Sequence, residues 1–469
     1  MQCFSRNLWG ALAAATLLAG STTAQQQTQA APSEPAQPSV ALEQAKGAAG
    51  PPATVTLADA IARAQKVSAQ YLGTVGDASN AHEDTSQARN AMLPQASATS
   101  QFLGTEGYGP GKPTIGRFVT QDGVHVYRAW GVFKQDLSPD TYLATGYHHA
   151  QAAEAIAKAK SEIARRGLTV TVTQDYYGLA AAQRKYASAQ AALDQAQHFL
   201  TLTKDEQNTG QAAHADVLKA QIAAEQQQQT LEDANLAMEN ARLNLAVLLF
   251  PTLDENFTVV DDLDTAAPMP AFSEMQDMAA KQNPQLRVAM EAVRQADVDV
   301  AAAKGAFLPS FNVEADYGIE ANHFALRSVN VEFPDFGPLP NLGYYVAAGV
   351  TIPVWDWGTL RSKLHQSETN REQARVELSQ SQREQLADLY SAFNEATVAR
   401  REVDLSAQAA NDAADSLRLT QLRYQAGEST AQEVVDSQNT LTQARNSHDD
   451  AQVHYRVAIA TLETFTGTF

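Results

Sequence analysis

The chain has 469 residues, of which 44% are hydrophobic, 7% aromatic and 19% charged. Much of the hydrophobic share is alanine, so the composition favours thin seams between helices over one thick core. A formal net charge of −19 argues against nucleic acid or an anionic membrane surface as a partner.

The N-terminus has the pattern of a secretory signal peptide. Arg6 precedes the apolar run LWGALAAATLLAG and the small residues STTA, so we expect residues 1–24 to be removed after Ala24. The run is shorter than the roughly 20 apolar residues that span a bilayer. Cys3, the only cysteine, leaves with it, so we expect no disulfide or lipid anchor in the mature protein. Residues 25–54 then form a flexible leader rich in Pro, Gln and Ala.

A period of seven residues indicates long coiled-coil helices. The period resumes past Gly210, so the chain turns there and comes back. Both arms recur 217 residues further on, with the second turn at Gly427. The seam positions are Val172, Leu179, Tyr186, Leu193, Leu200, Val217, Ala224, Leu231, Met238 and Leu245, and their counterparts are Leu389, Ala396, Val403, Ala410, Leu417, Val434, Leu441, His448, Tyr455 and Leu462.

This duplication predicts two structural repeats in a mainly α fold with a small β part. Each repeat runs helix, strand, loop, strand and long hairpin. The first covers 55–267, with strands at about 95–103 and 124–137, and the second covers 268–469, with strands at about 310–319 and 343–354. The outgoing arms of the hairpins, about 143–208 and 359–426, would each be on the order of 100 Å long.

The predicted strands alternate apolar and polar residues. In LPSFNVEADYGIE, Phe311, Val313 and Ala315 alternate with Asn312 and Glu314. About ten such residues is the length of a tilted strand that crosses a bilayer. Any one strand fits a small soluble sheet equally well. Two hairpins with long Gly- and Pro-rich loops, at 104–123 and 321–342, favour a transmembrane barrel.

Four strands cannot close a barrel, and an open sheet edge cannot lie in lipid. Several copies must therefore share one barrel. Two copies would supply about eight strands, whose interior fills with side chains, and three would supply about twelve, which leaves a water-filled lumen. A homotrimer is therefore the smallest assembly that makes a pore.

Three segments resemble motifs of the TolC family of outer-membrane efflux proteins. They are IPVWDWGTLRSKL at 352–364, VTLADAIARAQKVS from Val55 and RYQAGESTAQEVVDSQ at 423–438. The resemblance extends over nearly the whole chain after the leader. It implies a homotrimeric channel-tunnel in which a twelve-stranded barrel in the outer membrane continues into a helical tube in the periplasm. Such a duct is not an enzyme; it passes substrates outward passively, with a periplasmic adaptor and an inner-membrane pump or secretion transporter as partners.

The strand-to-helix junction of the second repeat carries the most specific motif, at Pro353, Trp355, Asp356 and Gly358. Trp355 and Trp357 suit an interfacial aromatic girdle against outer-membrane lipid. Gly358 permits a tight turn, and Asp356 or Thr359 can cap the helix. The corresponding first junction, at 133–146, lacks this signature and carries Lys134 and Asp136, which leaves the end of its strand open.

The resemblance also assigns roles to residues near the two turns. Acidic residues at the positions of Glu433 and Asp436 ring the periplasmic aperture in that family. Asp216 follows Gly210 at the same spacing at which Glu433 follows Gly427. The alternative is that they are solvated carboxylates at a helix start, where the dipole favours them. The best candidates for adaptor contact at the hairpin tips are Gly210, Arg423, Tyr424, Gln425, Gly427, Glu428 and Ser429.

The sequence shows no pattern of a cofactor, metal or catalytic site. No histidine pair has the i, i+4 spacing of a helical zinc site, and there is no phosphate-binding glycine loop. Two other protein classes stay in competition with an export duct. A periplasmic adaptor also pairs helical hairpins with β-structure, but it does not need the duplication; a secreted coiled-coil protein does not need the strands.

Overall fold

The computed structural model describes residues 52–104, 125–252, 256–265, 269, 271–321, 324–329, 335 and 337–467. The predicted signal peptide, nearly all of the leader and the loop at 105–124 lie outside these residues. The first half contains β1 (Ala53–Val55), α1 (Leu57–Val67), α2 (Ala69–Asn90), β2 (Gln95–Gly104), β3 (His125–Leu137), α3 (Pro139–Tyr142), α4 (Thr145–Asn208), α5 (His214–Leu249) and β4 (Phe257–Val259). The second half contains α6 (Phe272–Gln282), α7 (Pro284–Gly305), β5 (Ser310–Ala321), β6 (Arg327–Val329), β7 (Pro338–Pro340), β8 (Leu342–Thr351), α8 (Thr359–Gln425) and α9 (Ala431–Thr466).

The helices of the two halves match in length, which confirms the predicted duplication. The pair α1 and α6 has 11 residues each, α2 and α7 have 22 each, and α5 and α9 have 36 each. The outgoing arms, α4 and α8, have 64 and 67 residues. The break between the two shorter helices is also repeated, because Ser68 and Asn283 both accept hydrogen bonds from backbone N–H groups of the helix that follows. The domain boundaries themselves stay predictions.

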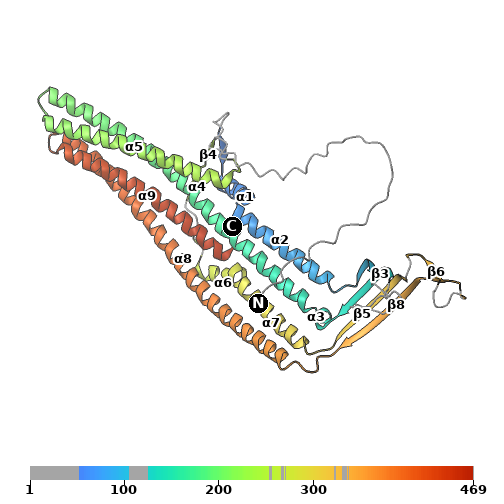
Figure 1. Cartoon of the computed structure of the whole chain (residues 1–469). Coiled ribbons are helices and arrows are strands. Elements are labelled where there is room, and N and C mark those ends of the chain that lie inside the picture. Colours follow the sequence, from blue (N-terminus) through green and yellow to red (C-terminus); the bar gives the residue numbers. More distant parts are fainter. Residues whose placement is uncertain are drawn as a thin grey trace, which may run out of the picture. The chain divides into compact units, whose positions relative to one another are not determined.

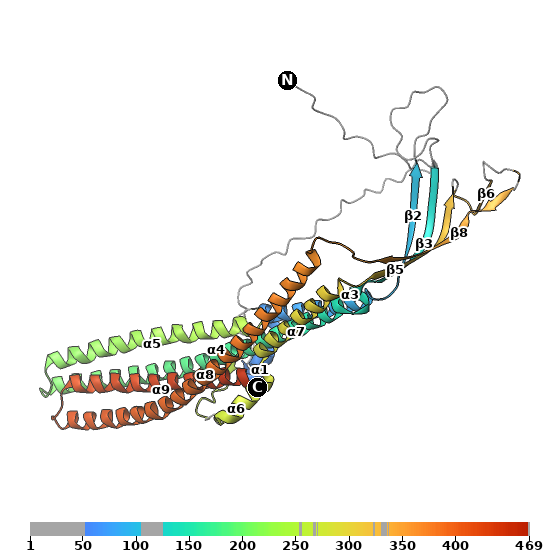
Figure 2. The same cartoon turned by 90° about the horizontal axis from the view of Figure 1, so that it is seen from below.

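Two long hairpins dominate the helical part (Figure 1). Helix α4 packs along α5, α8 packs along α9, and the hairpins contact each other through α4 and α9 (Figure 2). All of the predicted seam positions are buried or half-buried. Alanines such as Ala220 and Ala396 have no exposed surface, so the helix backbones approach closely along these seams. The heptad pattern therefore predicted both the hairpins and the faces that they bury.

A second core forms where the short strands meet α4. Strand β1 pairs with β4 in parallel, and Val55 and Phe257 from these strands pack with Tyr176 and Leu245. The Tyr176 hydroxyl lies 2.9 Å from the carbonyl oxygen of Val260 and 3.1 Å from that of Val55. This core was not predicted from the sequence. It fixes the segment after α5 against the outgoing helix of the same repeat.

The four predicted strands form one antiparallel sheet in the order β2-β3-β5-β8. The register puts the odd-numbered residues of β3 and β5 on the same side as the even-numbered residues of β2 and β8. We call this side the apolar face and the opposite side the polar face. No helix of the described residues is both long and apolar enough to cross a membrane.

Two details differ from the sequence-based expectation, and one strand end that the sequence left open agrees with the predicted bound of 137. Strand β8 ends at Thr351, not at 354, because Pro353 has no N–H with which to continue the ladder. The expected loop at 321–342 contains a short hairpin, in which β6 pairs with β7. The end of the first repeat's second strand, which the sequence left open, is Leu137.

Candidate functional site

Both hairpins turn through the same backbone motif. Gly210 and Gly427 have φ values of +78° and +77°, so each outgoing helix ends in a left-handed cap at the predicted turn. At the second turn, Gly427 N–H donates to the carbonyl of Tyr424 at 2.9 Å and Glu428 N–H donates to that of Arg423 at 2.8 Å. Equivalent bonds close the first turn. These pairs satisfy the last carbonyls of each outgoing helix.

The ends of the two hairpins pack together in a small cluster that we call the tip cluster. It contains Phe199, Leu200, Ala220, Ala223, Tyr424, Ala431, Val434 and Val435. The Tyr424 ring lies 5.1 Å from the Phe199 ring, and its hydroxyl donates to a carboxylate oxygen of Glu206 at 2.8 Å. Burial and this bond raise the pKa of Tyr424 to about 12. The predicted contact residue Tyr424 therefore joins one hairpin to the other, through partners that the sequence analysis did not single out.

Glu433, predicted at the aperture, has a local structural role. With Thr430 it forms a capping box at the start of α9, in which each side chain accepts from the other's backbone N–H. Ser429 Oγ donates to Glu433 Oε2 at 3.0 Å, and this bond is the main cause of the lowered pKa of Glu433. Arg423 Nη1 lies 3.8 Å from the same oxygen. The geometry fits the alternative of a carboxylate at a helix start, and it keeps an ionised carboxylate exposed at the turn.

The other two predicted aperture residues have fewer partners. Asp436 is exposed in the second turn of α9, and its hydrogen-bond donor among the described residues is Gln432 Nε2, at 2.8 Å. Asp216 is half-exposed in the first turn of α5, with Lys219 Nζ 3.7 Å away. Among the described residues, no hydrogen bond or ion pair connects Asp216 with Glu433 or Asp436. The helix-dipole alternative therefore applies to Asp216 and Glu433 but not to Asp436.

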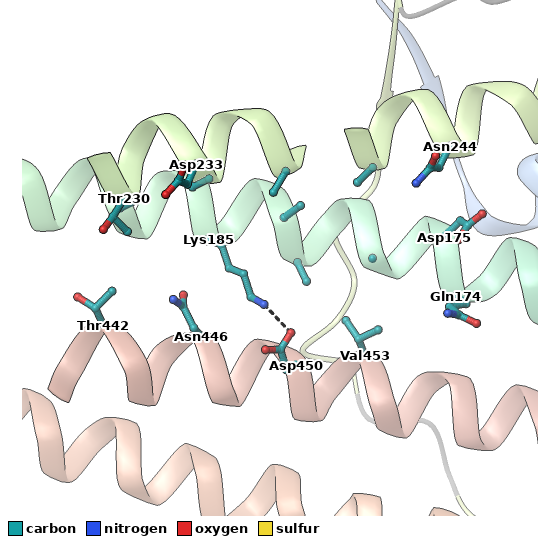
Figure 3. A pocket seen from close by; sticks show the side chains of 17 residues that line it. Gln174, Asp175, Lys185, Thr230, Asp233, Asn244, Thr442, Asn446, Asp450 and Val453 are labelled. Atoms are coloured by element: carbon teal, nitrogen blue, oxygen red, sulfur yellow. Dashed lines mark hydrogen bonds and ion pairs between the residues drawn. The ribbon is translucent and has the colours of Figure 1, made fainter. Parts of the chain in front are cut away.

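A cleft of about 620 Å³ lies further along the hairpins, between α4, α5 and α9 (Figure 3). Alanines and Gly178 form much of its wall. Lys185 on α4 crosses it to an oxygen of Asp450 on α9, 2.6 Å away. Burial raises the pKa of Asp175, which also lines the cleft. The ion pair gives the two hairpins a polar connection in addition to the tip cluster.

The faces of the sheet differ sharply in chemistry. All six Asp, Glu, Lys and Arg residues of its four strands lie on the polar face: Arg128, Lys134, Asp136, Glu314, Asp316 and Glu320. The apolar face has none. Its large side chains are nevertheless exposed, including Tyr344 at 83% and Val346 at 62%. A surface that is apolar and uncovered in one chain requires a partner or a lipid environment.

The junction after β8 is organised by Asp356. This carboxylate accepts from Gly358 N–H at 3.0 Å and from Leu360 N–H at 2.6 Å, so it caps α8 as predicted. Gly358 has φ +83°, and Trp357 has the unusual φ of +57°. The rings of Trp355 and Trp357 lie 5.7 Å apart and are 76% and 88% exposed. Their exposure suits the predicted aromatic girdle, which stays a prediction.

The first junction reaches a similar geometry without the motif. Asp140, in the short helix α3, accepts from Gly146 N–H at 2.7 Å and from the Thr145 hydroxyl. Ala144, like Gly358, precedes its long helix with a positive φ, +53°. An aspartate therefore caps both outgoing helices. The sequence analysis missed Asp140 because its spacing from the helix start differs from that of Asp356.

The described residues contain no group of three or more His, Cys, Asp or Glu side chains placed to hold a metal ion.

Residues 276–468 match the model of the family described as outer membrane efflux protein. The chain is 23% identical over 285 residues to the pyoverdine export outer membrane protein OpmQ of Pseudomonas putida, an alignment that covers 60% of this chain and 58% of that one. It is 23% identical over 423 residues to the outer membrane protein TolC of Vibrio cholerae, with 88% and 90% covered. The chain thus spans somewhat over half of OpmQ. These matches confirm the resemblance predicted from the sequence, and the predicted outer-membrane localisation agrees with them.

Two solved structures have a similar fold. The Campylobacter jejuni CmeC outer membrane channel superposes with a TM-score of 0.70 at 17% identity, over 88% of this chain and 86% of that one. The open state of the Neisseria gonorrhoeae MtrE outer membrane channel gives 0.71 at 20% identity, over 88% of each. The predicted fold class, long helical hairpins with a small β part, is confirmed.

Replacing Tyr424 with Phe should loosen the tip cluster. The change keeps the ring on Phe199 but removes the hydrogen bond to Glu206, which is worth about 1 kcal/mol. We expect backbone amides around both turns to exchange hydrogen about fivefold faster. Hydrogen–deuterium exchange with mass spectrometry measures this. Tyr390→Phe, on α8 against Phe272, is the control, and equal exchange in both variants would contradict the assignment.

Proposed function

We propose that this chain, whose fold is that of the outer membrane efflux channels, is one subunit of a passive export duct in the outer membrane. The observation that carries the proposal is the sheet. All of its charged side chains lie on one face, and the other face is apolar and exposed. A strand that separates lipid from water has this alternation.

The open edges of the sheet support assembly into a trimer. Among the described residues, strands β2 and β8 have no neighbouring strand on their outer sides. Their unpaired N–H and C=O groups would be costly in lipid, so another copy must pair with them. Three copies would supply about twelve strands, a number that leaves a water-filled lumen.

The helices support the same assembly. Helix α5 exposes Leu218, Ile222, Leu236 and Val247, and α8 exposes Val398, Leu405, Leu419 and Leu422. Within one chain the two hairpins contact each other mainly through α4 and α9. Helices α5 and α8 therefore lie on the outer sides of the pair. In a closed ring of hairpins, α5 of one copy would cover α8 of the next. The apolar side chains would then lie in a second kind of seam, between subunits.

The duct would take its partners at its two ends. Lipid would surround the apolar face and the exposed tryptophans after β8. A periplasmic adaptor would contact the turns at Gly210 and Gly427, and through it an inner-membrane pump or secretion transporter would supply the energy. The OpmQ relatives are named for pyoverdine export, but the alignment covers only 58% and 57% of them, so we propose no substrate from these names.

The competing classes fit the structure less well. A periplasmic adaptor has no need of four strands of 10 to 13 residues with one uncovered apolar face. A secreted coiled-coil protein has no need of the sheet at all. Recovery of the protein only from the soluble periplasm, with the sheet folded in a monomer, would favour either class over the duct.

Neighbouring residues of β8 test which face meets lipid. Val346 lies on the apolar face and Ala347 on the polar face. An arginine on the lipid side costs about 2–4 kcal/mol per strand at the bilayer centre, so Val346→Arg should abolish heat-modifiable trimers in outer-membrane extracts. Ala347→Arg, the matched control, should leave trimers at the wild-type level. Trimers from both variants, or from neither, would contradict the proposed orientation.

The turn carboxylates can be tested by conductance. Replacing Glu433 and Asp436 together with alanine should lower the preference of the reconstituted pore for K⁺ over Cl⁻, because three copies would lose six carboxylates near the entrance. Reversal potentials across planar bilayers measure the preference. The double variant Glu384→Ala/Asp388→Ala removes the same charge from α8, far from the turn. Unchanged selectivity in the Glu433/Asp436 variant would count against a carboxylate ring.

A further inference from the structure

The charged residues of the polar face form a ladder between β3 and β5. Arg128 is the cross-strand partner of Glu320, and its Nε and Nη2 donate to Glu320 Oε1 at 2.9 and 2.7 Å. Lys134 is the partner of Glu314, with Nζ 3.3 Å from Oε2. Each of these rows is neutral. The face as a whole has two basic and four acidic side chains, so it carries a net charge of −2 in the described strands.

Asp316 lies between these two neutral rows and has no basic partner in its own. Its neighbours across the ladder are Val132 on β3 and Tyr345 on β8. The residue is only 8% exposed, and its Oδ1 is buried and accepts no hydrogen bond from the described residues. It is not among the charged residues that form ion pairs in this sheet, which are Arg128, Lys134, Glu314 and Glu320.

A buried carboxylate without a partner is costly, because the oxygen loses water and receives no donor in return. The two basic side chains of this face, Arg128 and Lys134, are already bound to other acids, so they compensate it poorly. Asp316 Oδ1 lacks a positively charged partner, and a metal cation or an ammonium group can be that partner. Because the oxygen is buried, water also screens its field less than that of a solvated surface carboxylate.

We propose that Asp316 makes the polar face of the sheet a cation-selecting element, separate from the carboxylates at the hairpin turns. The inference rests on the proposed function, in which this face lines the lumen of a trimeric barrel. Three copies of Asp316 would then encircle the lumen at one level. The element acts on inorganic cations and on the protonated amino groups of transported molecules, because both provide the charge that the carboxylate lacks.

Substitutions in the row that contains Asp316 can separate the effect of its charge from the effect of its side-chain shape. In this row Ser97 of β2 pairs with Val132, which pairs with Asp316, so Ser97 and Asp316 lie on the same face at the same level. Asp316→Asn removes the charge with little change in shape. Ser97→Asp in the Asp316→Asn background returns a carboxylate to the row from another strand.

The experiment measures reversal potentials of the full-length trimer in planar bilayers under a KCl gradient. Asp316→Asn should lower the K⁺/Cl⁻ permeability ratio by roughly two- to threefold near 0.1 M salt, where charges act over about 10 Å. Ser97→Asp/Asp316→Asn should restore most of the ratio. Lys134→Gln/Glu314→Gln, which removes a neutral pair, should leave it unchanged. Block by putrescine, a diammonium ion, tests organic amines and should weaken in Asp316→Asn.

Several results would overturn the inference. One is an unchanged permeability ratio in Asp316→Asn, and another is a fall that Ser97→Asp does not reverse, since the effect would then come from shape. If Asp316→Asn does not assemble, Ser97→Lys in the otherwise wild-type chain places a positive charge in the same row; it should lower the ratio, and no change would reject the idea. Failure of the wild-type protein to form any pore would instead reject the proposed function.

Discussion

Every backbone N–H and C=O group in a hydrocarbon environment needs a hydrogen-bond partner, and the proposed assembly of this protein depends on that constraint. The four strands satisfy one another in the interior of the sheet but leave β2 and β8 with one open side each. In the proposed duct, the need to pair these edges would make the small sheet part of a larger assembly. It also explains the register. A shift by one residue would move charges such as Arg128 and Lys134 to the apolar face.

The helical part is held together by narrow seams between helices and not by the pairing of strand edges. Two helical hairpins packed side by side have little interior, so their stability comes from the seams between helices rather than from a thick core. Alanine at buried seam positions lets the helices approach closely, and the leucines and tyrosines between them fill the remaining space. Polar contacts then determine how one hairpin lies against the other. Among these contacts are those of Tyr424 with Glu206 and of Lys185 with Asp450.

The sequence predicted those features that repeat or that depend on local backbone chemistry. A period of seven locates every seam residue, a period of two locates all four long strands, and the glycines at 210 and 427 identify both turns. The missed features arise from contacts between distant segments. Strands β1 and β4 have three residues each, too few for a periodic signal, and they exist because Tyr176 and the core of α4 hold them. Glu206 could not be told apart in the sequence from other acidic residues on its helix, because its partner Tyr424 lies on the other hairpin. Asp140 performs the capping task of Asp356 at another spacing, which a motif search does not detect.

The predicted site shows why a residue type at the expected position does not by itself define a role. Glu433 caps α9 and is exposed at the turn, so its negative charge is available to a pore while its geometry is fixed by the helix. Asp436 has no such structural task among its described contacts. In the sheet the same distinction separates Glu314 and Glu320, which balance basic partners, from Asp316, which balances none.

Charges that are paired within the chain set its register and its caps. Asp436 at the turns and Asp316 in the sheet form no ion pair among the described residues, so their charges are not balanced within the chain, and they lie in its helical and β parts respectively. A cation that moves through a trimer of such chains would therefore meet an uncompensated carboxylate near each end of its path.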